Sequence, residues 1–369
     1  MKIAIIGAST GQQPLCRKAK EMGLETYCFA WEKGAICKNI VDHFFPISIF
    51  DTNKIASICK RENIDGIVSN ASEQIAFVTS ILAKELKKPG VSPEVIKTIK
   101  NKAAVRKISS HIPELRTVRA QLFTGEKAAP FYPCLVKPCT GSGKQGVSFV
   151  KNDTDFANAI QYAKSAESDK ILIEEFIDGN EISVESLSAK GKHFVIQITD
   201  KENSGPPHFV ELSHHEPSSI NQNIKHRIQA IISKLLSAVN YTDGASHIEL
   251  KVTKTGEIAL IEINPRGGGD EISNQLVTLS SGTDYLKGII EIALGIFKKP
   301  TTLHIPQYAG IYFLCAQTKN RLNFFKNADK KSWLVEKKIL NTSLQDATSN
   351  RNRNGYLIYC ADHKIGINE

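Results

Sequence analysis

The order of predicted strands and helices changes near residue 95, and this change constrains the fold more than any single motif. Before it, strand patterns alternate with helical patterns, which predicts a parallel sheet covered by helices. After it, strand patterns come in close pairs, which predicts antiparallel strands and an α+β arrangement. The strand patterns lie at 2–7, 25–30, 64–69, 134–137, 147–150, 171–177, 181–188, 246–252 and 258–263.

The helical patterns and the C-terminal third complete the expected organisation. Residues 93–110 are predicted to be helical, and 222–239 form an amphipathic pattern with one apolar face. Residues 305–369 resume strand patterns around a helix. The predicted divisions are 1–95 for the parallel α/β domain, 96–180 and 181–304 for two α+β subdomains, and 305–369 for a closing subdomain.

Composition narrows the class of protein. The eight cysteines are scattered without a Cys-x-x-Cys pair, which argues against a zinc site or disulfide framework and fits a reducing cytoplasm. No signal peptide is recognised and no apolar stretch approaches the ~18 residues of a membrane span, so we expect no membrane partner. Of the net charge of +9, residues 319–353 supply +6, from nine Lys/Arg and three Asp/Glu. That segment matches no nucleic-acid module, so we expect a solvated basic face and no nucleic-acid partner.

Two glycine-rich loops differ in their spacing and in the structure that each one predicts. The loop from Gly7 to Gly11 reads Gly-x-x-x-Gly and lacks the dinucleotide-binding spacing. Gly141-Ser142-Gly143-Lys144-Gln145-Gly146 has that spacing, but it precedes a strand pattern rather than a helix. A glycine loop between antiparallel strands suits a flap whose backbone N–H groups fold over phosphates. A plain glycine-rich hairpin remains the alternative.

Lys137 lies in the strand that precedes this flap. It is predicted to point out of the strand beside the flap, where its ammonium group neutralises phosphate charge. An ordinary surface lysine is the alternative.

A predicted hairpin centred on Thr255-Gly256 brings two acidic residues together. In this register, paired residue numbers sum to 511, so Glu249 faces Glu262. Like charges directly opposite destabilise a sheet, so a cation is expected between them. Asn264 emerges on the same face, and two carboxylates with an amide oxygen suit Mg²⁺ or Mn²⁺.

The opposite face of this hairpin is expected to pack in the core. The alternative for the acidic pair is two solvated glutamates that pair with Lys251 or Arg266. Arg266 follows the hairpin directly, and its guanidinium group suits a substrate carboxylate or acyl-phosphate. The residues predicted to face the core are Ile248, Leu250, Ile261 and Ile263.

These motifs, in this order over residues 1–300, resemble the signature of ATP-grasp enzymes. The resemblance implies an N-terminal Rossmann-like pre-ATP-grasp domain and two subdomains that grip ATP with magnesium. It assigns Lys102 and Lys137 to the phosphates, Glu181 to the ribose, and Glu249, Glu262 and Asn264 to the metal. The adenine contacts fall on Glu174, Glu175, Phe176 and Ile177.

Within that superfamily, three further segments resemble L-amino acid ligases, which join two amino acids through an acyl-phosphate. The segments are 208–214, 247–251 and 264–270. By this analogy Glu211 meets a substrate ammonium, while His214 and Arg266 hold the carboxylate or acyl-phosphate. Without the analogy, His214-His215 is equally well a polar loop. Some relatives carry an aromatic residue where this chain has Asp270, which leaves the acceptor open.

The resulting prediction is an ATP-dependent carboxylate–amine ligase that uses small-molecule substrates and forms an amide bond. In the predicted mechanism, Lys137 and magnesium neutralise the charge that develops on the transferred phosphate. A homodimer is compatible with the resemblance. Two alternatives remain: a biotin carboxylase-like enzyme and a non-catalytic nucleotide-binding module.

Overall fold

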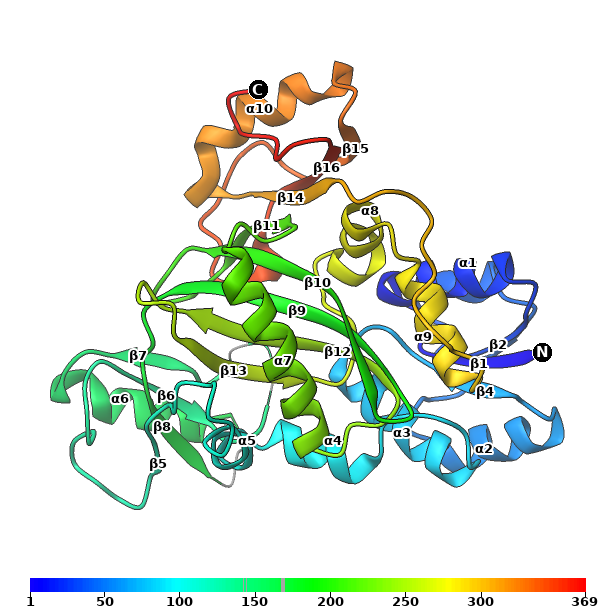
Figure 1. Ribbon diagram of the computed structural model, residues 1–369, viewed down its shortest axis with the longest axis horizontal. Coiled ribbons are helices and arrows are strands. Elements are labelled where there is room, and N and C mark those ends of the chain that lie inside the picture. Colours follow the sequence, from blue (N-terminus) through cyan, green and yellow to red (C-terminus); the bar gives the residue numbers. More distant parts are fainter. Residues whose placement is uncertain (142, 144, 167–169) are drawn as a thin grey trace.

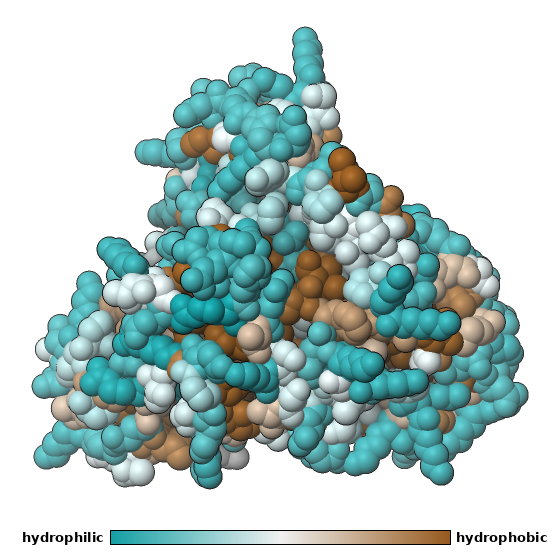
Figure 2. Space-filling view, in the orientation of Figure 1, coloured by the Kyte–Doolittle hydropathy of each residue, from teal (hydrophilic) through white to brown (hydrophobic). Residues whose placement is uncertain are grey.

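The computed structural model describes residues 1–141, 143, 145–166 and 170–369, and its parts form three lobes around a large central sheet (Figure 1). The N-terminal lobe lies on one side of this sheet, a small lobe on the other, and the C-terminal segment above it. The face shown in Figure 2 is mostly hydrophilic, and its hydrophobic residues gather toward the middle, between the lobes. In the described part of the chain, no helix has the length and apolar character needed to cross a bilayer.

The N-terminal lobe is a parallel four-stranded sheet in the order β3-β2-β1-β4, as the sequence predicts apart from the short β3. Strands β1, β2 and β4 are mostly buried and apolar because helices cover them. The strands are β1 (Lys2–Ile6), β2 (Glu25–Phe29), β3 (His43–Phe45) and β4 (Gly66–Val68), and the helices are α1 (Gln13–Glu21), α2 (Thr52–Arg61) and α3 (Glu73–Glu85).

The predicted helix over 93–110 is wrong in one respect, because the structure has two helices there. These are α4 (Pro93–Lys100) and α5 (Lys102–Ser109), separated at Asn101. Asn101 has an extended backbone with ψ of 102°, and its side chain accepts a hydrogen bond from the Ala104 amide. Asn101 therefore ends one helix and caps the next, which places Lys102 at the start of α5.

The small lobe is an antiparallel sheet in the order β5-β8-β6-β7, and α6 packs on it. The glycine loop joins β6 to β7, which are antiparallel neighbours, so the prediction of a loop between two strands is confirmed. Ser142 and Lys144 lie outside the described residues. The elements are β5 (Ala120–Leu122), β6 (Cys134–Pro138), β7 (Ser148–Val150), α6 (Asp153–Lys164) and β8 (Ile171–Glu175).

The central sheet has eight strands in the order β13-β12-β9-β10-β11-β14-β16-β15, and its described ladders are antiparallel. The C-terminal segment therefore continues the same sheet. The strands are β9 (Asn180–Ala189), β10 (Lys192–Asn203), β11 (Glu211–Glu216), β12 (Gly244–Val252), β13 (Ile258–Asn264), β14 (Tyr308–Leu314), β15 (Leu334–Ile339) and β16 (Gly355–Ala361).

Helices cover this sheet and join it to the N-terminal lobe. The amphipathic pattern at 222–239 forms α7, whose apolar residues pack in one core with strands β9, β12 and β13. The helices are α7 (Gln222–Ala238), α8 (Val277–Ser281), α9 (Tyr285–Ala293) and α10 (Leu322–Asn327).

Strands β10 and β11 have no counterpart among the strands expected from the sequence. The polar-loop alternative for His214-His215 is wrong, because both histidines lie on β11 and are buried. All six residues of β11 are buried, although most are polar. Polar side chains on a buried strand obscure the hydrophobic alternation by which strands are recognised.

Candidate active site

One cavity of about 370 Å³ brings together residues from every part of the chain. It opens between the small lobe and the central sheet, and Glu73 of the N-terminal lobe and Asn350 of the C-terminal segment also line it. Gly146 does not line the cavity, and Ser142 lies outside the described residues. The predicted site residues on its wall are Lys102, Lys137, Gly141, Gly143, Glu174, Glu175, Phe176, Ile177, Glu181, Glu211, His214, Glu249, Glu262, Asn264 and Arg266.

Lys137 on β6 lines this cavity together with Gly141 and Gly143 of the flap. It is buried, so the alternative of an ordinary surface lysine is wrong. Its Nζ lies 2.7 Å from Glu174 on the neighbouring strand β8. Arg106 of α5 donates to both oxygens of Glu174, at 2.5 and 3.1 Å. Burial lowers the pKa of Lys137, and the nearby Arg106 lowers it further, although Glu174 opposes this. Lys137, Arg106 and Glu174 therefore form a buried cluster of two basic groups and one carboxylate beside the cavity.

Glu175 and the residues after it form the predicted adenine wall. The Glu175 carboxylate accepts hydrogen bonds from the Arg119 amide at 3.0 Å and the Arg119 side chain at 2.9 Å. The Phe176 ring packs edge-on against Phe149 of β7, with centroids 4.7 Å apart. Lys102 Nζ donates to the Gly141 carbonyl at 3.1 Å, which links α5 to the flap. The adenine and phosphate roles stay predictions.

Glu249 and Glu262 are direct partners across β12 and β13, as the hairpin argument predicts. The uniform register is wrong, however: near the turn Leu250 pairs with Leu260, and a bulge shifts the ladder between Glu249 and Leu250. The extra residue is Ile261, so it lines the cavity instead of facing the core with Ile248, Leu250 and Ile263. Its carbonyl accepts a hydrogen bond from Arg106 at 2.9 Å.

The oxygen atoms around Glu262 suit a cation. Burial raises the pKa of Glu262, and the neighbouring charges of Glu249 and Glu73 raise it further. With its amide oriented to satisfy its neighbours, Asn264 donates to Glu262 at 3.3 Å and to Glu73 at 3.1 Å. Within the described residues, no group of three or more His, Cys, Asp or Glu side chains is arranged to hold a metal. The predicted trio of two carboxylates and one amide therefore needs phosphate or water oxygens to complete a magnesium site.

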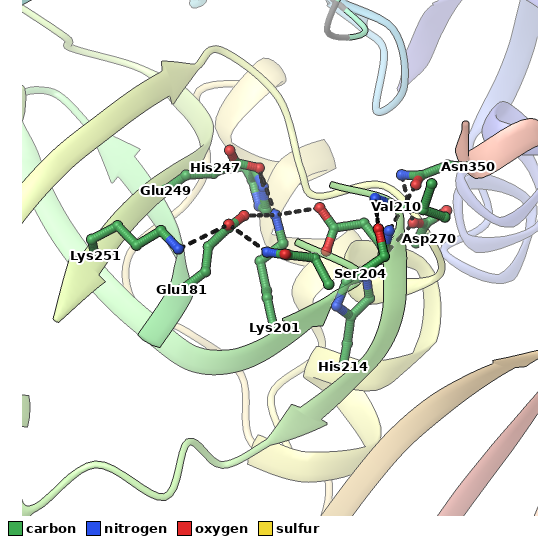
Figure 3. Close-up of polar contacts among 12 residues, drawn as sticks. Glu181, Lys201, Ser204, Val210, His214, His247, Glu249, Lys251, Asp270 and Asn350 are labelled. Atoms are coloured by element: carbon green, nitrogen blue, oxygen red, sulfur yellow. Dashed lines mark hydrogen bonds and ion pairs between the residues drawn. The ribbon is translucent and has the colours of Figure 1, made fainter. Parts of the chain in front are cut away.

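Lys201 of β10 is a central charge of the cavity, and the sequence argument missed it. Its Nζ lies 2.7 Å from Glu249, 3.1 Å from Glu181 and 3.3 Å from Glu211 (Figure 3). Burial lowers the pKa of Lys201, but these three carboxylates outweigh burial and raise it well above the usual value. Lys251, the alternative partner of Glu249, instead lies 3.7 Å from Glu181.

His247 connects Glu249 to a deeper carboxylate. Its Nδ1 contacts Glu185 of β9, and its Nε2 lies 3.2 Å from Glu249 (Figure 3). Burial lowers the pKa of His247, but the two carboxylates raise it to about 9. Gly268 packs tightly here: its amide donates to Glu185 at 3.0 Å, and a Cβ would lie 2.8 Å from His247. Gly268 is therefore required for the backbone to approach this pair.

The substrate end of the cavity is built by β11 and the loop after β13. Arg266 lies 3.8 Å from Glu73 and donates to the Gly267 carbonyl at 2.9 Å. In the described part of the chain, Arg266 Nε and His214 Nδ1 are buried without a hydrogen-bond partner. A buried polar atom without a hydrogen-bond partner lowers the stability of the fold unless a ligand pairs with it. They suit the carboxylate or acyl-phosphate that the sequence argument places here.

The C-terminal segment contacts the substrate end of the cavity through Arg353 and Asn350. Arg353 donates to both oxygens of Asp270, at 2.9 and 2.5 Å, and to the Glu211 carbonyl at 3.3 Å. Asn350 accepts from the Glu211 amide at 3.0 Å and donates to Asp270 at 3.4 Å (Figure 3). His214 and Arg353 lower the pKa of Asp270 against the effect of burial. Nothing in the local sequence around Asn350 signals this long-range contact.

Comparisons with known proteins identify the fold. A family model described as an ATP-grasp domain matches residues 130–275. This match covers less than half of the chain and agrees with an ATP-grasp fold. The solved structure of an L-amino acid ligase from Bacillus licheniformis superposes with a TM-score of 0.79 at 21% identity, covering 98% of this chain and 93% of that one. The prediction of an ATP-grasp fold is therefore confirmed.

Curated sequences match this chain at low identity. An alanine–anticapsin ligase of Bacillus amyloliquefaciens is 25% identical over 258 residues, covering 62% of this chain and 50% of that protein. An uncharacterized protein of Sinorhizobium fredii is 29% identical over 246 residues, covering 64% of this chain and 50% of that protein. The match thus spans half the length of both relatives. ATP-grasp ligases are the enzyme class that the sequence predicts, and these comparisons support it.

Proposed function

We propose that the chain is an ATP-dependent carboxylate–amine ligase that forms an amide bond through an acyl-phosphate, with an amino acid as one substrate. The observation that carries the proposal is a single cavity lined by both the predicted nucleotide set and the predicted substrate set. Glu211, His214 and Arg266 line the same cavity as the acidic pair Glu249 and Glu262. A carboxylate substrate and a nucleotide can therefore meet in one place, as phosphoryl transfer requires.

The nucleotide end suits ATP. Lys102 and Lys137 are cations at the base of the glycine flap, and they suit the phosphate chain. Glu181, at the edge of the cavity beside Lys251, suits the ribose hydroxyls. Phe176 and Ile177 supply an apolar wall for the base. Closure of the flap would exclude water from the reacting groups.

Glu249, Glu262 and Asn264 would hold magnesium. The repulsion that raises the pKa of Glu262 is relieved when a divalent cation binds. When bound, the metal neutralises charge on the phosphate oxygens. Asn264 already bridges Glu262 and Glu73, so turning its amide would present an oxygen to the ion.

The reaction then divides into two steps at the substrate end. The substrate carboxylate attacks the γ-phosphorus of ATP, the bond to the β-phosphate oxygen breaks, and ADP leaves. Arg266 holds the carboxylate and then the acyl-phosphate, with its unpaired Nε directed to an anionic oxygen. Glu211 holds the ammonium group of the amino acid. A neutral amine then attacks the acyl carbon, and the bond from that carbon to the phosphate oxygen breaks. Phosphate leaves and takes up the proton that the amine nitrogen loses, which leaves the amide.

Phosphate release with pools of amino acids tests the proposal, and mass spectrometry of the same mixtures identifies the condensed product. Release that needs both a carboxylate and an amine, with a product lighter than their sum by one water, supports it. Turnover that requires bicarbonate would assign a carboxylase instead. No release with any carboxylate–amine pair, together with tight ATP binding, would leave a nucleotide-binding module.

A further inference from the structure

Lys201 ends a row of three charged side chains that runs across three strands of the central sheet. In direct register, Lys251 of β12 pairs with Glu181 of β9, and Glu181 pairs with Lys201 of β10. Alternating charges directly opposite one another stabilise a sheet. The row lines the cavity, and Lys201 is its most buried charge, with a side chain 4% exposed.

Three carboxylates converge on the Lys201 ammonium from three different strands. Glu249 comes from β12, Glu181 from β9 and Glu211 from β11, all within 3.3 Å of Nζ. The proposed function gives each carboxylate a different ligand: magnesium, ribose and the substrate ammonium. With the ammonium among them, these carboxylates are not arranged to hold a metal, and neither is any other acidic group of the described residues. Without the ammonium, three carboxylate oxygens around one point would suit a divalent cation. One buried ammonium therefore occupies the point where an ion would otherwise bind.

We propose that Lys201 is an internal cation that keeps Glu181, Glu211 and Glu249 from sharing a divalent metal ion, and so reserves each for its own ligand. Lys201 is thus a positioning residue, because it acts through the three carboxylates. The ligands named for these carboxylates rest on the proposed function, whereas the contacts of Lys201 do not.

The arrangement explains how one cavity can bind a divalent metal ion and the substrate ammonium at separate places. Glu249 faces Glu262 on one side and Lys201 on the other. With Lys201 in place, a metal that reaches Glu249 has Glu262 and Asn264 as its remaining ligands. Without Lys201, Glu249 could chelate an ion together with Glu181 and Glu211. That ion would block the place of the substrate ammonium.

The test measures Mn²⁺ binding in the absence of nucleotide. Binding is monitored by the decrease in the electron paramagnetic resonance signal of free Mn²⁺. Lys201→Met is expected to bind Mn²⁺ at least about tenfold more tightly than the wild-type chain, because three oxygen donors become available. Adding Glu211→Gln should abolish the gain, whereas adding Glu262→Gln should leave it intact. Loss of the gain with Glu262→Gln would place the ion at the predicted magnesium site and overturn the proposal.

The same series of variants includes a control for loss of folding. Three carboxylates that lose their shared cation oppose folding of Lys201→Met, so Tm is measured with and without Mn²⁺. Recovery of Tm by Mn²⁺ supports the proposal, because the metal then replaces the ammonium. A folded Lys201→Met chain that binds Mn²⁺ no better than wild type overturns it, as does an unfolded one that Mn²⁺ does not restore. Neither result depends on ligase activity, so failure here is distinct from failure of the proposed function.

Discussion

Glu249 and Glu262 are direct partners across β12 and β13, although the hairpin that joins these strands closes in a different register. The bulge at Ile261 accounts for both facts. Near the turn, the ladder places Ile258 and Leu260 in the core. One extra residue then turns Ile261 and Glu262 toward the cavity and returns Ile263 to the core. The bulge thus adds an acidic group to the cavity without exposing the core.

The Glu262→Gln variant is expected to lose turnover by about a hundredfold or more, because one carboxylate of the metal trio becomes a neutral amide. Its Tm should be unchanged or higher, since the substitution removes a buried charge that Glu249 and Glu73 repel. Phosphate release and thermal unfolding measure the two effects. Glu257→Gln, at an exposed position on the same hairpin, is the matched control. Retained turnover in Glu262→Gln would contradict the metal assignment.

Glu174 is expected to stabilise the fold in a pH-dependent way. Burial raises its pKa, but Arg106 and Lys137 outweigh burial and lower it from 4.5 to about 2. A lowered pKa in the folded state contributes stability above pH 4.5 that is lost as the pH falls toward 2. The difference between the usual and the lowered pKa of Glu174 corresponds to about 3 kcal/mol of unfolding free energy.

Denaturant unfolding from pH 7 down to pH 3 measures this contribution. The Glu174→Gln variant should be destabilised by about 3–5 kcal/mol at pH 7, because two buried cations lose their partner. It should also lose less stability than wild type on acidification. Parallel curves for the two chains would show that another carboxylate governs acid unfolding.

The sequence predicted those parts of the fold that local pattern determines. The parallel N-terminal sheet and the hairpins follow from apolar runs and turn residues, which act over a few positions. Strands β10 and β11 were missed because residues such as Lys201 and His214 are polar yet buried. Their burial is stabilised by partners on other strands, and no single-sequence periodicity reports such partners. The same limit hid Asn350, which reaches Glu211 from 139 residues away.

His247 should remain protonated at neutral pH. Glu185 and Glu249 outweigh burial and raise its pKa from 6.5 to about 9. A raised pKa in the folded state gives stability that is complete below pH 6.5 and declines as the pH rises through about 9. The pH dependence of unfolding should therefore slope downward over this range in wild type and flatten in His247→Asn. The exposed His226→Asn is the control, and an imidazole that titrates near 6.5 by NMR would exclude the prediction.

Arg353 is expected to govern binding of the amino-acid substrate without touching the nucleotide end. Its guanidinium group pairs with Asp270 at two points and supports the Glu211 carbonyl, so it fixes both sides of the substrate end. In Arg353→Met, the partly buried Asp270 loses its guanidinium partner and retains the contacts with His214 and Asn350, and β11 loses a charge-assisted contact. The KM for the amino acid should rise by about tenfold, which is the loss of one hydrogen bond to a charged group. The KM for ATP should stay within about twofold of wild type.

Arg351 provides the matched control, because it lies in the short helix Asn350–Asn352, directly before Arg353 at the C-cap, and is exposed. Arg351→Met removes the same charge and should leave both constants unchanged. If Arg353→Met raised the KM for ATP as much as the KM for the amino acid, the C-terminal segment would support the cavity as a whole. Equal effects of the two substitutions would instead mean that only the positive charge of this segment matters, through long-range attraction of anionic substrates.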